Sequence, residues 1–347
     1  MIVTTYYGHP IGWLGQPSNL ASHSNLSFWK TVLSLLSKEQ PVFLAFVAEH
    51  TPHSPGTTGT KLLVTKDRDP MGTIGGGIME FNLVKRAKDI LGNRKFTPEL
   101  QTLNHQKTGP GEKSGMMCAG QQTNLYYLCC SEKDKKTIEQ IVRILIRNQS
   151  AFLSISPDGM IIREQQLDVH KTQFKLSKAG HDWLYEEQLL NFNRIALIGG
   201  GHCSLALSRI MNQLGYDVFV FDTRNNVSTV GENKYAQSVQ IVADYTETAD
   251  NIVHPEITQV VVMTTDVVSD VRGLLGALQY PFPFIGIMGS QAKISEIKKR
   301  LKSEGISKDQ LTKLTAPVGI PMASNTPEEI AISVAAQLLQ LRDELSN

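Results

Sequence analysis

The chain has 347 residues, which is enough for two domains with separate hydrophobic cores. Its 34 basic and 33 acidic side chains nearly balance, so no basic excess calls for nucleic acid or an anionic membrane as a partner. We find neither an apolar run of about 20 residues nor a signal-peptide pattern, and we expect a cytoplasmic protein that does not enter a membrane. The four cysteines form no C-x-x-C pair, so neither a zinc site nor a disulfide framework is indicated.

The first part of the chain, residues 1–190, is expected to form a mixed α and β domain after an irregular extension over 1–25. Apolar periodicity and turn residues predict its elements in chain order. These are a helix over 26–37, strands over 42–48, 61–65 and 71–74, a helix up to about residue 91, a strand over 123–129, a helix over 135–148, and a hairpin over 151–156 and 159–164.

A glycine triplet, Gly75-Gly76-Gly77, stands between the strand over 71–74 and the helix that follows. Such a turn can present several backbone N–H groups to a phosphate. It fits no dinucleotide pattern, because no apolar strand with a terminal acid follows it. Glu80, near the start of the helix, is either a capping carboxylate or a functional acid, and composition alone favours the cap.

Cys118 lies in the glycine-flanked segment 115–120, just before the strand over 123–129. A cysteine among glycines is sterically accessible, which suits a thiolate that meets a ligand or a sulfur donor. A small buried residue is the other interpretation, and the residues alone favour it slightly.

From residue 191 to 347 the pattern changes to strands alternating with helices. Apolar strand cores lie near 195–198, 218–221, 239–242, 259–263 and 283–287. This alternation predicts a Rossmann-like, doubly wound parallel sheet. The boundary between the two domains is expected near 188–193.

The first of these strands runs into Gly199-Gly200-Gly201-His202, and the next strand ends in Asp222. This is the Rossmann arrangement, in which glycines let the backbone approach a pyrophosphate at the N-terminus of a helix. Asp222 could accept a hydrogen bond from a ribose 2′-hydroxyl, whereas Arg224 could pair with a 2′-phosphate. A Rossmann-like domain that binds no dinucleotide is the alternative.

The strand over 283–287 leads into Gly289-Ser290, followed by Lys293 one turn into a helix. Ser290 suits the N-cap of that helix. Carboxyl ends of parallel strands share one edge of a sheet, so Lys293 could supply a second anion contact beside Gly199. A capped turn with a solvated lysine is equally consistent. Further along, Thr326-Pro327-Glu328-Glu329 predicts a structural capping box.

In this order, the segments resemble the xanthine dehydrogenase accessory family, also called XdhC/CoxI. The segments that carry the resemblance are 49–56, 61–64, 72–80, 115–120, 198–202, 222–224, 286–293, 316–320 and 326–331. The chain departs from the usual family pattern at Ala119, where a glycine is common, and at Ser204, where the Rossmann turn often has glycine or alanine.

The resemblance implies a maturation chaperone rather than a turnover enzyme. Members bind molybdenum cofactor, as molybdopterin or its nucleotide form, support its sulfuration, and help to insert it into a xanthine dehydrogenase-type molybdenum hydroxylase. A cysteine desulfurase is the implied sulfur source, Cys118 is implied to lie near molybdenum, and a homodimer is the expected assembly. The residues implied to contact the cofactor are Gly75, Gly76, Gly77, Cys118, Gly199, Gly200, Gly201, His202, Asp222, Arg224, Gly289, Ser290 and Lys293.

Two other functions are compatible with the Rossmann pattern. An NAD(P)-dependent oxidoreductase would use Asp222 and Arg224, although no obvious acid–base pair stands between residues 234 and 294. A nucleotide-binding regulatory module would use the same turn without chemistry.

Overall fold

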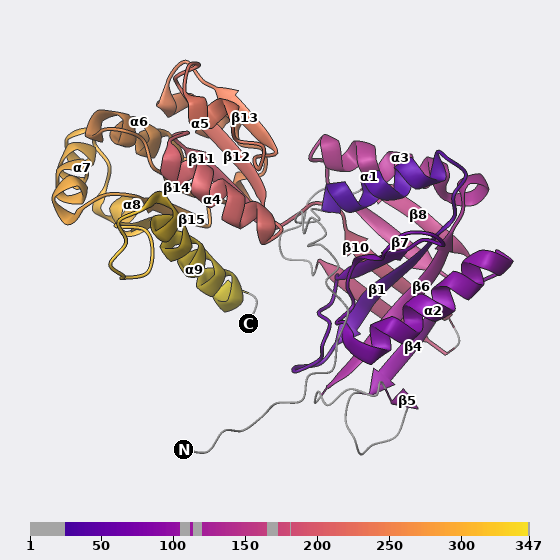
Figure 1. Cartoon of the computed structure of the whole chain (residues 1–347). Helices are drawn as coiled ribbons and strands as arrows, with labels where there is room; N and C mark the ends of the chain where they lie inside the picture. Colours follow the sequence, from indigo (N-terminus) through magenta and orange to yellow (C-terminus); the bar gives the residue numbers. More distant parts are fainter. Residues whose placement is uncertain (1–24, 105–111, 114–119, 165–172, 181, 346–347) are drawn as a thin grey trace, which may run out of the picture.

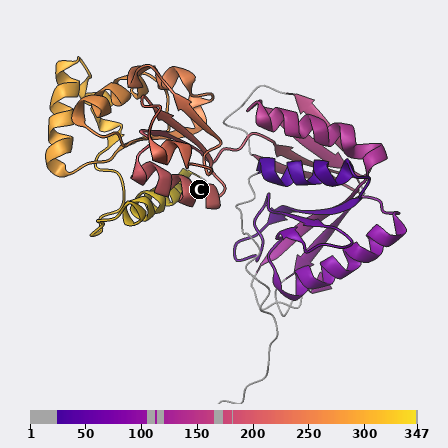
Figure 2. The same cartoon turned by 45° about the horizontal axis from the view of Figure 1, so that its top comes forward.

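The computed structural model describes residues 25–104, 112–113, 120–164, 173–180 and 182–345. Three sheets follow one another along the chain, two before residue 189 and one from residue 194 onward. Figure 1 and Figure 2 show the first two sheets in one body and the third in another, joined by the short segment between β10 and β11. The expected fold class, a mixed α+β region followed by a Rossmann domain, is confirmed.

The first body combines two mostly antiparallel sheets with three helices. The strand orders are β3-β2-β1-β6-β4-β5 and β8-β7-β10-β9. Its elements are α1 (Asn25–Leu36), β1 (Val42–His50), β2 (Lys61–Val64), β3 (Met71–Gly72), α2 (Gly77–Asn93), β4 (Glu99–Asn104), β5 (Glu112–Lys113), β6 (Gln121–Cys129), α3 (Ser131–Ile146), β7 (Ala151–Ser156), β8 (Gly159–Glu164), β9 (Phe174–Ala179) and β10 (Asp182–Gln188).

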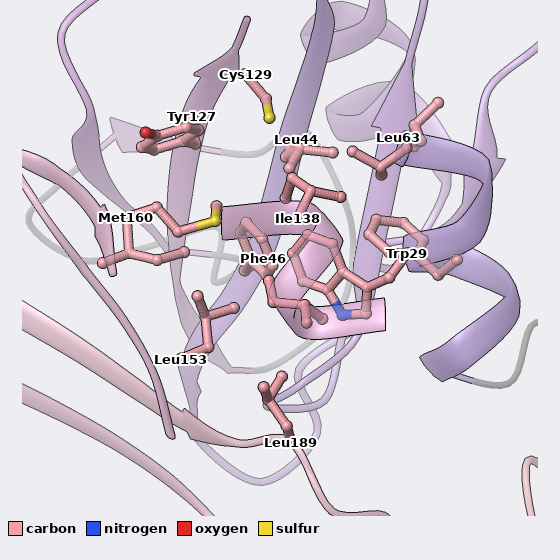
Figure 3. Packing of buried hydrophobic residues seen from close by; sticks show 14 of the residues in the cluster. Trp29, Leu44, Phe46, Leu63, Tyr127, Cys129, Ile138, Leu153, Met160 and Leu189 are labelled. Atoms are coloured by element: carbon pink, nitrogen blue, oxygen red, sulfur yellow. The ribbon is translucent and has the colours of Figure 1, made fainter. Parts of the chain in front are cut away.

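Strand β1 lies at the centre of this body because its apolar side chains serve two cores. Phe43 and Val47 face α2, whereas Leu44 and Phe46 face α1, α3 and the second sheet. Side chains alternate between the two faces of a strand, so an uninterrupted apolar run is buried on both. Trp29 of α1 is fully buried beside Phe46, with a ring-centroid distance of 6.3 Å (Figure 3).

The second body is a parallel sheet of order β13-β12-β11-β14-β15-β16. Its apolar strands are covered on one face by α4 and α9 and on the other by α6 and α7, so both faces contribute to a core. Its elements are β11 (Arg194–Ile198), α4 (His202–Gln213), β12 (Asp217–Asp222), α5 (Ser228–Gly231), β13 (Ser238–Ile241), three 3₁₀ turns (Tyr245–Glu247, Ala249–Asn251 and Pro255–Ile257), β14 (Thr258–Val262), α6 (Val267–Ala277), β15 (Phe284–Ile287), α7 (Gln291–Ser303), α8 (Lys308–Thr312), β16 (Leu314–Thr315) and α9 (Pro327–Leu345).

The capping box expected at the start of α9 is present. The Thr326 hydroxyl accepts from the Glu329 N–H at 3.2 Å, and the Glu329 carboxylate accepts from the Thr326 N–H at 3.1 Å. Among the helices that the structure describes, none has the length and apolarity needed to cross a membrane.

A buried arginine holds the two bodies together at their junction. Arg194, at the start of β11, is 1% exposed; it donates to the Asn148 side chain of the first body at 3.2 Å and lies 3.6 Å from the Asp217 carboxylate. The Asn148 carbonyl oxygen also contacts Nε2 of His254 at 2.9 Å. Asn148, two residues beyond the end of α3, thus contacts two residues of the parallel-sheet body.

The carboxyl of Asp217 gives this junction a pH dependence. Burial raises the pKa of Asp217 from 3.8 to about 6, against the opposing effect of Arg194. The native state therefore binds a proton that the unfolded state has released, and stability falls as the pH rises from about 4 to about 6. Between these pH values, the free energy of unfolding of Asp217→Asn is expected to decrease by about 2–3 kcal/mol less than that of the wild type.

Urea unfolding of the wild type and Asp217→Asn, at several pH values from about 4 to about 7, measures this difference. His254 and Glu256 also lie near the junction, and both are unchanged between the two proteins. Parallel pH profiles for the two proteins would contradict the assignment to Asp217.

Candidate functional site

The Rossmann glycine turn lies at the point where the strand order of the parallel sheet reverses. Gly199 follows β11, between β12 and β14, and has a φ of +108°. A Cβ at this position would lie 2.6 Å from the Met263 carbonyl oxygen, which directly follows β14. Only glycine fits this turn without strain, and the turn places the start of α4 over the crevice where Rossmann folds bind ligands.

Gly201, the N-cap of α4, leaves open space at the start of the helix. A Cβ built there meets nothing within 4 Å among the described atoms, and no described side chain caps the helix. The N–H groups of the first turn, from His202 to Ser204, are therefore available to an anion. The Ser204 side chain is buried and packs in the position where the motif usually has a smaller residue.

Asp222 is turned toward the protein rather than toward a ligand. One of its oxygens accepts from the Gly200 N–H and Arg224 Nη2, both at 2.7 Å. The other accepts from the backbone N–H and Nε of Arg224, both at 2.8 Å. These hydrogen bonds lower the pKa of Asp222, although burial opposes them as the largest single effect.

Four donors fill the four lone-pair positions of this fully buried carboxylate. Asp222 therefore has no acceptor position left for a ribose 2′-hydroxyl in this structure. Its role here is to hold Gly200 and Arg224. The helix α5 adds to this support, since the Thr229 hydroxyl donates to the Gly200 carbonyl oxygen.

Lys293 is likewise engaged within the protein. Its ammonium lies 2.5 Å from the carboxylate of Asp270, which is fully buried and also accepts from the Thr264 hydroxyl at 2.6 Å. Ser290 caps α7, as expected, by accepting from the Lys293 N–H at 3.3 Å. The positive charge at this edge is thus already paired with an acid.

His202 lines a groove between α4 and α9 with a volume of about 500 Å³. Arg209, Lys234 and Glu328 also line this groove, so its walls carry charges of both signs. Burial, and then the Glu328 carboxylate, raises the pKa of the Cys203 thiol. Cys203 is therefore a protonated, partly buried thiol, despite its place in the first turn of a helix.

The first glycine turn is organised by Glu80. One carboxylate oxygen accepts from the Thr73 hydroxyl at 2.7 Å, the Ile74 N–H at 2.9 Å and the Gly76 N–H at 3.1 Å. Gly75, Gly76 and Gly77 all have positive φ values, between +66° and +123°. Of the two roles left open by the sequence, the geometry is that of a capping carboxylate, which occupies N–H groups that a phosphate would otherwise meet.

Replacing Glu80 with alanine is expected to lower the free energy of unfolding by about 1–2 kcal/mol, because it removes three hydrogen bonds from the turn. All three tryptophans of the chain, at positions 13, 29 and 183, precede the parallel sheet, so tryptophan fluorescence in urea reports this body. Asp89→Ala removes an exposed carboxylate from the same helix and is the matched control. Equal losses in the two variants would refute the capping role.

Cys118 lies outside the described residues, and its predicted role stays a prediction. Cys129, eleven positions further along the sequence, is buried in β6, where burial raises the pKa of its thiol well above the usual value. Within the residues described, no group of three or more His, Cys, Asp or Glu side chains could hold a metal ion.

The sequence did not predict two residues that contact the site residues of the parallel-sheet body. Asp270 follows β14 at the start of α6, and Thr229 stands in the short α5. Asp270 had a detectable signal, because it is the one acid in the helical stretch from Val267 to Ala277 and stands among valines and leucines. Thr229 had none, since its contact depends on how α5 folds back over Gly200.

Both bodies match known families. Residues 195–338 match the XdhC Rossmann domain, and residues 35–103 match the XdhC and CoxI family. The crystal structure described as a xanthine dehydrogenase from Bacillus halodurans superposes with a TM-score of 0.69 at 21% identity, covering 92% of this chain and 96% of that one. The uncharacterised protein YqeB of Escherichia coli K12 is 26% identical over 161 residues, which is 43% of this chain and 27% of the length of YqeB.

Proposed function

This chain belongs to the XdhC and CoxI family, and we propose that it is an accessory protein in the maturation of a xanthine dehydrogenase-type molybdenum hydroxylase. Its cargo in this proposal is molybdenum cofactor, which it binds, shields during sulfuration and passes to the hydroxylase. The structural likeness over nearly the whole length of a protein described as a xanthine dehydrogenase supports the shared fold.

The open start of α4 is the observation that carries the proposal. A molybdopterin cargo ends in a phosphate or a nucleotide, and the free N–H groups after Gly201 suit that anionic tail. The saturated carboxylate of Asp222 weighs against an NAD-dependent oxidoreductase, because it offers no acceptor to the ribose that such an enzyme recognises. The chain therefore suits a carrier of a phosphate-bearing cargo better than a dehydrogenase.

Production of a xanthine dehydrogenase-type hydroxylase with and without this chain tests the proposal. We expect the chain to raise the sulfur content per molybdenum and the specific activity of the hydroxylase. The matched variant Gly201→Val, which places a branched side chain where the anion approaches, should lose most of this gain. Equal sulfur content and activity with and without the chain would contradict an accessory role.

The proposed part of Cys118 is to hold the cargo near its metal. Cys118→Ala is expected to lower the amount of molybdenum retained through purification, whereas Cys129→Ala and Cys130→Ala should retain it. Cys129 is buried in β6, and Cys130 is the half-buried N-cap of α3, so neither lies in the glycine-flanked segment that suggests a role for Cys118. Equal retention in all three variants would remove Cys118 from the site.

A further inference from the structure

A pocket of about 300 Å³ is lined mainly by the first body, where it reaches Thr73 beside the first glycine turn, and none of the residues of the Rossmann glycine turn lines it. It lies between α1, the β2–β3 edge and the strands β9 and β10. Its walls include Phe28, Phe174, Lys61 and Glu187, and Asn191 of the linker lines it as well. This volume is at the lower end of the range for small-molecule sites in proteins.

The polar part of the pocket is a buried ion pair. Lys61 Nζ lies 2.7 Å from a carboxylate oxygen of Glu187, and the two side chains are 11% and 1% exposed. The ammonium also donates to the Gly59 carbonyl oxygen at 3.1 Å, and Glu187 accepts from the Tyr185 hydroxyl at 3.1 Å. Burial, followed by Glu187, raises the pKa of Tyr185, so the phenol stays protonated and donates.

Both members of this ion pair have hydrogen-bonding positions that no described residue uses. Within the described residues, one of the three N–H groups of Lys61 has no acceptor, and Glu187 uses two of its four lone-pair positions. A buried ion pair contributes little net stability compared with apolar residues of similar volume. A ligand that uses the remaining donor and acceptors accounts for the pair better than stability does.

The apolar part of the pocket depends on two glycines. A Cβ on Gly59, which has a φ of +91°, would lie 2.2 Å from the Phe174 ring, and a Cβ on Gly72, with a φ of +85°, would lie 2.2 Å from the Lys61 carbonyl oxygen. These positions therefore bring an aromatic ring and the strand edge close to the ion pair. Aromatic walls of this kind favour a flat ligand.

We infer that this pocket binds a 2-amino-4-oxopyrimidine ring of the pterin class. In such a ring a carbonyl oxygen stands beside a ring N–H and an amino group. The carbonyl oxygen would accept from Lys61, the N–H groups would donate to Glu187, and the flat ring would lie against Phe174. Guanine has the same edge, and the choice of a pterin rests on the proposed cargo.

Fluorescence titration of the full chain with 6-carboxypterin, which carries no metal and no phosphate, tests the inference, with GMP as a second probe. We expect saturable binding of the pterin that weakens at least about tenfold in Lys61→Met/Glu187→Gln, which removes both charges together. The matched control is Lys178→Met/Glu49→Gln, which removes an exposed ion pair of the same body and should leave the affinity unchanged.

Phe174→Leu provides a second variant in case the double substitution unfolds the protein, because it keeps an apolar contact with Gly59 but removes the aromatic face. Pterin binding that survives unchanged in both pocket variants, or no saturable binding, would overturn the inference. Saturable binding of GMP alone would overturn the choice of a pterin.

The failure of the pocket and the failure of the proposed function can be told apart. If the pterin binds but molybdenum cofactor never co-purifies with the chain, the proposed function fails and the pocket assignment stands. If the cofactor co-purifies with the wild type and equally with the pocket variants, the pocket assignment fails and the proposed function stands.

Discussion

Replacing Arg194 with methionine is expected to lower the free energy of unfolding by about 3–5 kcal/mol. The methionine keeps much of the apolar contact with Phe219, over whose ring the guanidinium lies at 4.6 Å. It leaves the Asp217 carboxylate buried without its cation and removes the donor to Asn148 of the first body. Urea unfolding followed by far-ultraviolet circular dichroism measures the loss.

The double variant Arg194→Met/Asp217→Asn tests whether the unpaired charge of the Asp217 carboxylate causes the loss. It leaves no unpaired buried carboxylate, so it should recover a large part of the stability lost in the single variant. If the single variant loses less than about 1 kcal/mol, or if the double variant recovers nothing, the ion pair is not what makes Arg194 important.

Gly199→Ala is expected to cost about 3 kcal/mol or more, because the new methyl group meets the Met263 carbonyl oxygen at 2.6 Å and the backbone has a φ of +108°. Gly201→Ala, two residues further, meets open space at a φ of −75° and should change stability by less than about 1 kcal/mol. The same substitution is thus expected to cost much more stability at Gly199 than at Gly201, within one turn.

Circular dichroism and tryptophan fluorescence separate the two bodies in this experiment. Because all three tryptophans precede the parallel sheet, Gly199→Ala should shift the dichroism transition more than the fluorescence transition. Similar stabilities for Gly199→Ala and Gly201→Ala would show that the contact with the end of β14 does not constrain the turn.

The architecture of the second body was predictable because most of its strands have apolar centres and alternate with helices. Each strand core expected in the range 195–287 is present, and the glycine turn stands at the carboxyl end of β11 as its pattern indicates. The strands β9 and β10, which extend the predicted β7–β8 hairpin into a four-stranded sheet, were not predicted. Phe174–Ala179 has mostly exposed polar side chains, so its pairing with β10 is held by backbone hydrogen bonds that composition does not reveal.

The partners of the charged site residues could not be predicted, since they depend on tertiary contacts. Nothing near Lys293 in the sequence indicates that Asp270, on another helix, neutralises it. The local pattern at Asp222 and Arg224 is the same whether the carboxylate faces a ribose or the Gly200 N–H. The sequence left two roles open for Glu80, a capping carboxylate and a functional acid. Only its three contacts with its own turn distinguish these roles.

Mass spectrometry of the small molecules released from the purified chain tests the central claim most directly. The protein is produced in a host that makes molybdenum cofactor and in a matched host that does not. We predict molybdopterin or its nucleotide form, together with molybdenum, from the first preparation only, and a reduced amount from Gly201→Val. Recovery of NAD(P) in place of a molybdopterin, or of no molybdopterin from either host, would contradict the account.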